Sequence, residues 1–272
     1  MLKARLISAA VMVPLVVTAV LYLPTNVFAL LLALILAAGL WEWSRLVPLH
    51  GMVARLVYVG LVMLLPVLLW QLQPENHLDL VLSVAVIWWL WALYWVAHPQ
   101  IGVQAGLLTT SLKMLAGVLV MVPAWVALVV LHGNDNKGPL LVLIVLIMIW
   151  LADSGAYFAG RKWGRSKLAP LVSPGKTREG VYGGLLASLV FAAAAGGFYS
   201  QSYSWTLAFL VVSLLAMMFS VVGDLLESLM KRQSGIKDSG SIIPGHGGIL
   251  DRIDSMVAAA PMFLVGLRWL SL

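Results

Sequence analysis

Residues 140–150 read LLVLIVLIMIW, and residues 31–41 read LLALILAAGLW. A strand of a membrane β-barrel would alternate apolar and polar side chains. Neither run does so, and both are therefore predicted to be helices. Of the 272 residues, 62% are apolar and 10% are charged, against about 25% charged residues in ordinary soluble domains. The sequence therefore predicts an all-α, polytopic transmembrane helix bundle.

The composition excludes several other classes of protein. The chain has no cysteine, which rules out a disulfide-stapled secreted fold, thiol catalysis and zinc–thiolate sites. Its high hydrophobicity rules out a disordered chain. The net charge of +6 does not call for nucleic acid, because basic residues also orient membrane proteins and attract anionic lipid headgroups. An anionic substrate at the cytoplasmic face is compatible with the same charge.

A helix needs about 20 mostly apolar residues to cross the hydrocarbon core of a bilayer. About nine such segments can be placed by this criterion. The predicted spans are 6–23, 27–43, 56–72, 78–97, 114–132, 139–159, 180–199, 205–223 and 249–270. We expect a single integral membrane domain over 1–272, with membrane helices in 1–138 and the site-bearing helices and cytoplasmic loops in 139–272. The first span reads as an uncleaved helix rather than a signal peptide, because another hydrophobic stretch follows at once.

Basic residues are unevenly distributed between the predicted loops. If the N-terminus lies in the cytoplasm, every lysine and arginine except Lys137 and Arg268 falls on the cytoplasmic side. Positive charge is typical of cytoplasmic loops. We therefore expect a cytoplasmic N-terminus. The polar segments 160–179 and 224–248 would then lie at the cytoplasmic membrane edge.

The densest polar segment, 223–255, reads GDLLESLMKRQSGIKDSGSIIPGHGGILDRIDS. In its first part, four residues have the spacing i, i+3, i+4, i+7 and are predicted to share one helical face. They are Asp224, Glu227, Ser228 and Lys231. In its last part, Asp251, Asp254 and Ser255 share another face. A glycine-rich turn between them would let the two carboxylate-bearing helix ends face each other across a cleft.

Carboxylate oxygens without cysteine or clustered histidine favour a hard cation, Mg²⁺ before Zn²⁺. Lysine, arginine and glycine N–H groups around such a cation suit phosphate oxygens. This chemistry indicates phosphoryl or nucleotidyl transfer. The alternative is that the acids cap helices and pair with local bases, and this alternative is strongest for Asp238 and Asp254.

A second polar segment, 150–180, reads WLADSGAYFAGRKWGRSKLAPLVSPGKTREG. Asp153 is predicted at the cytoplasmic end of its helix. Ser173, Lys176 and Thr177 fall in a Pro/Gly turn that can present a hydroxyl, an ammonium and free N–H groups to an anion. The full GxxxxGK[ST] pattern is absent, which excludes a Walker motif. We expect this segment to complete the same site.

The stretch from Ser228 to Asp254 resembles the signature of the phosphatidate cytidylyltransferases, also called CDP-diacylglycerol synthases. That signature is S-x-x-K-R, four residues, K-D, a glycine-rich turn, H-G-G, two residues and D-R-x-D. Every element is present, as Ser228, Lys231, Arg232, Lys237, Asp238, His246, Gly247, Gly248, Asp251, Arg252 and Asp254. The segments that begin at Asp153 and at Ser173 resemble family elements less specifically.

The resemblance implies a Mg²⁺-dependent enzyme of the bacterial cytoplasmic membrane, with its active site facing the cytoplasm. It would join CTP and phosphatidic acid, giving CDP-diacylglycerol and pyrophosphate. The catalytic residues carried over are Asp224, Asp251, Ser228 and Lys231, and the candidate metal ligands are Asp224, Asp251, Glu227 and Asp254. The candidate substrate-binding residues are Asp153, Ser173, Lys176, Thr177, Arg232, Lys237, His246 and Arg252. Membrane lipids are expected partners, nucleic acid is not, and a homo-oligomer stays open.

Two other functions compete with this interpretation. An ion-coupled transporter would place acids near the bilayer midplane, whereas here they gather at one edge. A lipid or polyprenol kinase is a closer rival, because it also needs metal and phosphate ligands.

Overall fold

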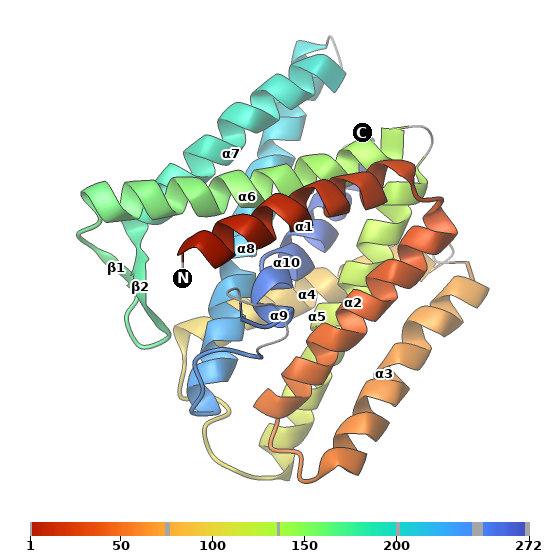
Figure 1. Ribbon diagram of the computed structural model, residues 1–272, viewed down its shortest axis with the longest axis vertical. Helices are drawn as coiled ribbons and strands as arrows, with labels where there is room; N and C mark the ends of the chain where they lie inside the picture. Colours follow the sequence, from red (N-terminus) through yellow and green to blue (C-terminus); the bar gives the residue numbers. More distant parts are fainter. Residues whose placement is uncertain (1, 74–76, 135–136, 200–201, 241–246, 270–272) are drawn as a thin grey trace.

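The computed structural model describes residues 2–73, 77–134, 137–199, 202–240 and 247–269, and it is almost entirely helical (Figure 1). The N-terminal half consists of α1 (Leu2–Tyr22), α2 (Thr25–Leu46), α3 (Met52–Gln71), α4 (Leu78–Ala97) and α5 (Leu107–Gly133). The C-terminal half contains α6 (Gly138–Trp163), α7 (Arg178–Tyr199), α8 (Tyr203–Gln233), α9 (Leu250–Ile253) and α10 (Met256–Trp269). An antiparallel hairpin of β1 (Lys167–Ala169) and β2 (Ser173–Thr177) links α6 to α7.

In the described part of the chain, seven helices are long and apolar enough to cross a membrane, namely α2 to α8. Each of them overlaps one predicted span, which confirms the prediction of an all-α, polytopic membrane protein. The hairpin between α6 and α7 is a small departure from it. Helix α8 also continues ten residues beyond its predicted end at 223, to Gln233. This extension carries the polar face of α8 beyond the apolar part of the helix.

The two terminal spans are not among these helices. The predicted span 249–270 is divided, because α9 ends at Ile253 and α10 begins at Met256 with 14 residues. Asp254 and Ser255 form a turn between the two helices, and the Asp254 carboxylate accepts a hydrogen bond from the N–H of Ser255 at 2.7 Å. In the described part of α1, Ala10–Tyr22 forms an apolar helix that is shorter than the seven spans. The count of nine spans and the orientation of the bundle stay predictions.

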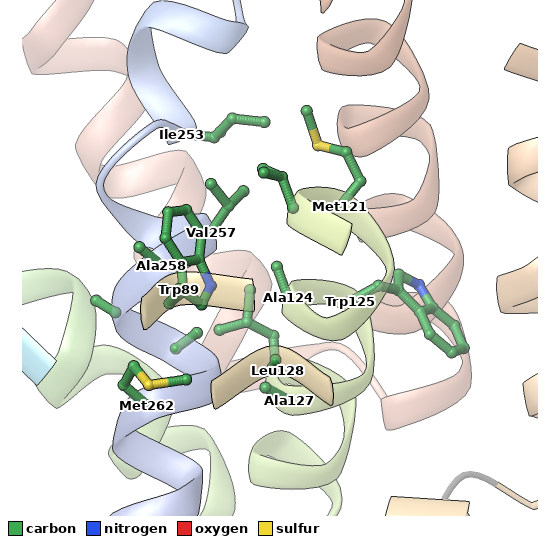
Figure 2. Close-up of a cluster of buried hydrophobic side chains, with 14 of the residues drawn as sticks. Trp89, Met121, Ala124, Trp125, Ala127, Leu128, Ile253, Val257, Ala258 and Met262 are labelled. Atoms are coloured by element: carbon green, nitrogen blue, oxygen red, sulfur yellow. The ribbon is translucent and has the colours of Figure 1, made fainter. Parts of the chain in front are cut away.

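The broken C-terminal segment is anchored in the core between α4 and α5. Figure 2 shows Trp89 of α4, Met121 and Leu128 of α5, and Val257 and Met262 of α10 gathered in one apolar cluster. All five side chains are buried. Because lipid tails are as apolar as these side chains, the cluster is stabilised by close van der Waals packing between the helices. The core thus holds α10 firmly and fixes the position of α9, which precedes it.

Small residues allow α6 and α7 to pack closely. A Cβ on Gly155 would lie 2.7 Å from the carbonyl oxygen of Gly183, and a Cβ on Gly183 would collide with Ala159. At the adjacent Gly184, a Cβ would collide with the carbonyl oxygen of Ala152. Small side chains are what let membrane helices approach at backbone distance. This contact sets the position of the hairpin, which lies at the end of both helices (Figure 1).

Contacts between helix ends join residues that the sequence assigned to the same side of the membrane. The Gln233 amide at the end of α8 donates to the carbonyl oxygens of Pro99 and Ile101 at 2.9 and 2.8 Å. At the other end of the bundle, Arg268 lies 2.9 Å from Asp79. Both sets of contacts agree with the predicted sidedness of the loops.

Candidate active site

One face of α8 carries the polar side chains of the first motif. Lys231 Nζ lies 2.9 Å from Glu227 Oε2, and the Ser228 hydroxyl donates to Asp224 Oδ1 at 3.5 Å. Glu227, Ser228 and Lys231 are buried. Burying ionised groups is costly unless they are paired, and the helical spacing pairs them.

Asp251 meets this face from α9. Its Oδ1 lies 2.7 Å from Lys231 Nζ, so Lys231 bridges the carboxylates of Glu227 and Asp251. Its Oδ2 accepts hydrogen bonds from the N–H of Gly248 at 2.8 Å and from the N–H of Ser239 at 3.3 Å. Loss of hydration alone would raise the pKa of Asp251, but the hydrogen bonds from Lys231 and Gly248 outweigh it and lower the pKa to about 2. The carboxyl group of Asp251 is therefore ionised at physiological pH.

Asp254 adds a further carboxyl group to the cluster. Loss of hydration, followed by the negative charges of Asp224 and Glu227, raises the pKa of Asp254 well above its usual range. The backbone of Asp254 approaches α8 closely because Gly223 has no side chain there. A Cβ on Gly223 would collide with the carbonyl oxygen of Asp254. Acids from α8 and from the segment after α9 thus share one site.

The β1–β2 hairpin brings a second lysine into the site. Lys176 on β2 forms an ion pair with Asp224 of α8. The hydroxyl oxygen of Thr177 accepts a hydrogen bond from the N–H of Gly180 at 3.1 Å, which satisfies a free donor in the first turn of α7. The two polar segments of the sequence, 150–180 and 223–255, therefore meet through Lys176 and Asp224.

A cavity of about 430 Å³ opens between α6, α7 and α8 beside this ion pair. Its lining includes polar side chains from Asp153, Arg161, Lys176, Thr177 and Asp224. It also includes apolar side chains from Val181, Leu185, Met217 and Val221. Asp153 is close enough to Asp224, Lys176 and Arg252 for their charges to act on it. The cavity thus combines charged groups with hydrocarbon in its lining.

The remaining predicted substrate-binding residues are placed in several ways. Ser173 is partly buried on β2, and Lys237 is exposed after the end of α8. Arg232 donates from Nε to the carbonyl oxygen of Val172 at 3.4 Å, which ties α8 to the hairpin. His246 lies outside the described residues.

Sequence reasoning missed one residue of this region, Glu42. It lies in α2, it is fully buried, and its carboxylate accepts hydrogen bonds from the turn that leads to Asp251. The predicted span 27–43 does contain this single acid. An acid inside a membrane span is costly and often functional, and this was the available signal.

The carboxylates of the site suit a hard cation, although they are not preassembled around one. Among the described residues, no three acidic or histidine side chains stand together as a ready metal-binding group. Glu227 Oε1 is nevertheless buried without a hydrogen-bond partner in the described structure. An unpaired carboxylate oxygen close to the charges of Asp224 and Asp254 has the chemistry of a Mg²⁺ ligand.

Comparison with known proteins agrees with the motif. A family model described as the cytidylyltransferase family matches residues 3–270. A Pseudomonas aeruginosa protein named phosphatidate cytidylyltransferase is 42% identical, over 99% of this chain and 97% of its own length. A Haemophilus influenzae protein of the same name is 38% identical, over 97% of each chain. A Staphylococcus saprophyticus protein of that name is 43% identical over 48% of this chain and 50% of its own. By its sequence from end to end, the chain belongs to the cytidylyltransferase family.

Proposed function

We propose that this protein is a phosphatidate cytidylyltransferase, which transfers CMP from CTP to phosphatidic acid and releases pyrophosphate. The relatives that match nearly the whole chain carry that name. The observation that carries the proposal is the meeting of the two polar segments through the ion pair between Lys176 and Asp224. Both residues line a cavity that has charged and apolar side chains around it. Within the second segment, the bridge from Lys231 to Asp251 holds α9 against α8.

The reaction requires two polyanions to approach each other. A phosphate oxygen of phosphatidic acid forms a bond to the α-phosphorus of CTP, and the bond from that phosphorus to the bridging oxygen of pyrophosphate breaks. The second pKa of a phosphate monoester is about 6. The nucleophile is therefore already largely ionised near neutral pH, and no general base is needed. The work of the protein is to position the phosphates and to neutralise their charge.

Basic residues in and near the cavity fit this task. The ammonium groups of Lys176 and Lys231 are held by carboxylates, which fixes where each can meet a phosphate oxygen. Arg161 lines the cavity, and Arg252 is close enough to Asp153 for its charge to act there. The apolar lining of Leu185, Met217 and Val221 provides hydrocarbon contact, as an acyl chain from the bilayer would require. Ser173, Arg232 and Lys237 remain proposed substrate contacts from the signature.

Magnesium belongs to the proposal as the cofactor. The residues that would hold it are Asp224, Glu227, Asp251 and Asp254. The unpaired oxygen of Glu227 and the raised pKa of Asp254 support this set, because both indicate a shortage of positive charge among these acids. When bound, the ion would stabilise negative charge on the phosphoryl group and on the leaving pyrophosphate.

The proposal also includes the finer topology. The N-terminus and the site lie at the cytoplasmic face of the bacterial inner membrane, and α1 and the α9–α10 segment complete nine crossings. The near-complete sidedness of lysine and arginine supports this arrangement. Because the chain has no cysteine, single cysteines can be introduced and labelled cleanly. Lys237→Cys should react only when the cytoplasmic face is accessible, and Asp79→Cys only from the opposite face.

Turnover with two differently labelled nucleotides tests the chemistry. Purified protein in detergent with phosphatidic acid and Mg²⁺ should move the label of α-labelled CTP into lipid and leave the label of γ-labelled CTP in pyrophosphate. Addition of EDTA should stop the reaction. Transfer of the γ-label to lipid would instead identify a lipid kinase, and no transfer of either label would refute the proposal.

A further inference from the structure

Glu42 is an unexpected residue for the interior of a membrane protein. It lies near the end of α2, a helix rich in leucine and alanine, and it is fully buried. An ionised carboxylate in such a place is costly unless hydrogen bonds or an opposite charge compensate it. In the described structure no lysine or arginine pairs with Glu42. Its compensation comes from another source.

That source is the two described segments that flank residues 241–246, Ser239–Gly240 and Gly247–Leu250, which together are called the turn below. Glu42 Oε2 accepts hydrogen bonds from the N–H of Leu250 at 2.8 Å and from the hydroxyl of Ser239 at 2.9 Å. Glu42 Oε1 accepts from the N–H of Ile249 at 3.1 Å. A carboxylate accepting several N–H and O–H groups makes charge-assisted bonds, which are stronger than neutral ones. Glu42 therefore fastens both ends of this turn to α2.

Two glycines of the turn lie directly against the same carboxylate. A Cβ on Gly240 or on Gly248 would lie 2.7 Å from the Glu42 carboxyl carbon. Any other residue at either position would push the turn away from Glu42. Gly248 belongs to the H-G-G element of the signature, and contact with Glu42 explains why a side chain does not fit there.

The turn also holds Asp251, on its other side. Ser239 donates its hydroxyl to Glu42 and its N–H to Asp251 Oδ2. Gly248 N–H donates to Asp251, while the next two N–H groups, of Ile249 and Leu250, donate to Glu42. The two carboxylates thus divide the donors of one short segment between them. A shift of the turn relative to α2 would move the donors that set Asp251 against Lys231.

We propose that Glu42 is a positioning residue of the active site, which acts through the Ser239 and Gly248–Leu250 backbone on Asp251. It touches no substrate. Its role is to lock the turn in the one arrangement in which Asp251 meets Lys231. The inference rests on the proposed function for its effect on turnover, and on geometry alone for its effect on the turn. It gives the N-terminal half of the chain, which lacks signature residues, a direct part in building the site.

Amide hydrogen exchange tests the geometric part independently of any reaction. In Glu42→Gln, one carboxylate oxygen is replaced by an N–H₂ group that faces N–H or O–H donors. Exchange at the Ile249 and Leu250 amides should become roughly tenfold faster or more. Exchange at the buried amides of α5 should not change. The control is Ser44→Ala, which removes another buried polar group of α2, a hydroxyl that donates to the Trp41 carbonyl within the same helix. It should leave exchange in the turn as in wild type.

The same variants test the catalytic part. Turnover with CTP and phosphatidic acid should fall roughly tenfold in Glu42→Gln, and Ser44→Ala should retain wild-type turnover. Gly248→Ala keeps the Glu42 side chain but adds a methyl group between the turn and the carboxylate. The turn should be displaced, and the loss of turnover should be similar. Ser239→Ala should lower turnover less, and its effect should not add fully to that of Glu42→Gln, because both act on one contact.

The outcomes separate the inference from the proposed function. Wild-type exchange in the turn of Glu42→Gln would overturn the inference, and so would wild-type turnover in both Glu42→Gln and Gly248→Ala. If Glu42→Gln does not fold, Gly248→Ala and Ser239→Ala decide the matter by the same two measurements. If exchange in the variants follows the expectation but the wild-type protein does not use CTP, the proposed function is refuted. Glu42 then remains the anchor of the turn.

Discussion

Lys231 on α8 and Asp251 on α9 are in direct contact, with Nζ 2.7 Å from Oδ1. The same ammonium lies 2.9 Å from Glu227. A single positive charge therefore holds two carboxylates from separate elements. This contact joins α9 to α8, as the ion pair between Lys176 and Asp224 joins β2 to α8.

Removal of the Lys231 charge should damage both folding and turnover. Lys231→Met removes the positive charge that the Glu227 and Asp251 carboxylates share. Breaking a buried pair in this way costs about 3–5 kcal/mol. We expect a clearly lower Tm in detergent and loss of nearly all CTP turnover. Lys167→Met, at an exposed lysine of β1, is the matched control and should keep both. A Lys231→Met protein with the wild-type Tm would contradict the bridging role.

Asp254 should destabilise the metal-free protein at neutral pH. Because its pKa is raised, folding favours the protonated form, and stability falls as pH rises from the unfolded value towards the folded pKa. Asp254→Asn cannot ionise and should therefore have a higher Tm than wild type in EDTA. Added Mg²⁺ should raise the Tm of wild type more than that of the variant. Equal Mg²⁺ effects on both would remove Asp254 from the proposed ligands.

Asp251 should show the opposite pH dependence. Its folded pKa of about 2 lies below the ordinary 3.8, so its ionised form stabilises the fold by about 2 kcal/mol. That contribution is complete above the unfolded pKa and is lost as pH falls through the folded pKa. The stability difference between wild type and Asp251→Asn in EDTA should shrink as pH falls below about pH 4. A difference that stays the same from about pH 5 to pH 2 would indicate a different environment for Asp251.

The close contact of α6 and α7 should be needed for the cavity. Gly184→Leu places a large side chain against the backbone of Ala152, where even a Cβ collides. The helices must separate, and overpacking of this kind costs about 1–3 kcal/mol or more. We expect a lower Tm and reduced turnover. Gly197→Leu on the same helix is the control, because a Cβ there meets nothing within 4 Å. If Tm and turnover fell equally in both variants, the close contact of α6 and α7 at Gly184 would not be what the cavity needs.

Much of the site could be predicted because it depends on local geometry. The placement of Asp224, Glu227, Ser228 and Lys231 on one face follows from the helical period alone. The signature then indicated which distant residue, Asp251, belongs with them. The apolar runs likewise predicted the helices α2 to α8, because a bilayer requires uninterrupted apolar length.

The tertiary structure decided what no local pattern encodes. The last predicted span is divided between α9 and α10. This division depends on how the two helices pack against α8 and the core. The position of Lys176 against Asp224 depends on the packing of α6 on α7. The contact of Glu42 with Leu250 joins residues about two hundred positions apart, and it exists only because α2 and the turn pack together. Sequence periodicity fixes the face of a side chain, whereas its partner is chosen by the way whole helices pack.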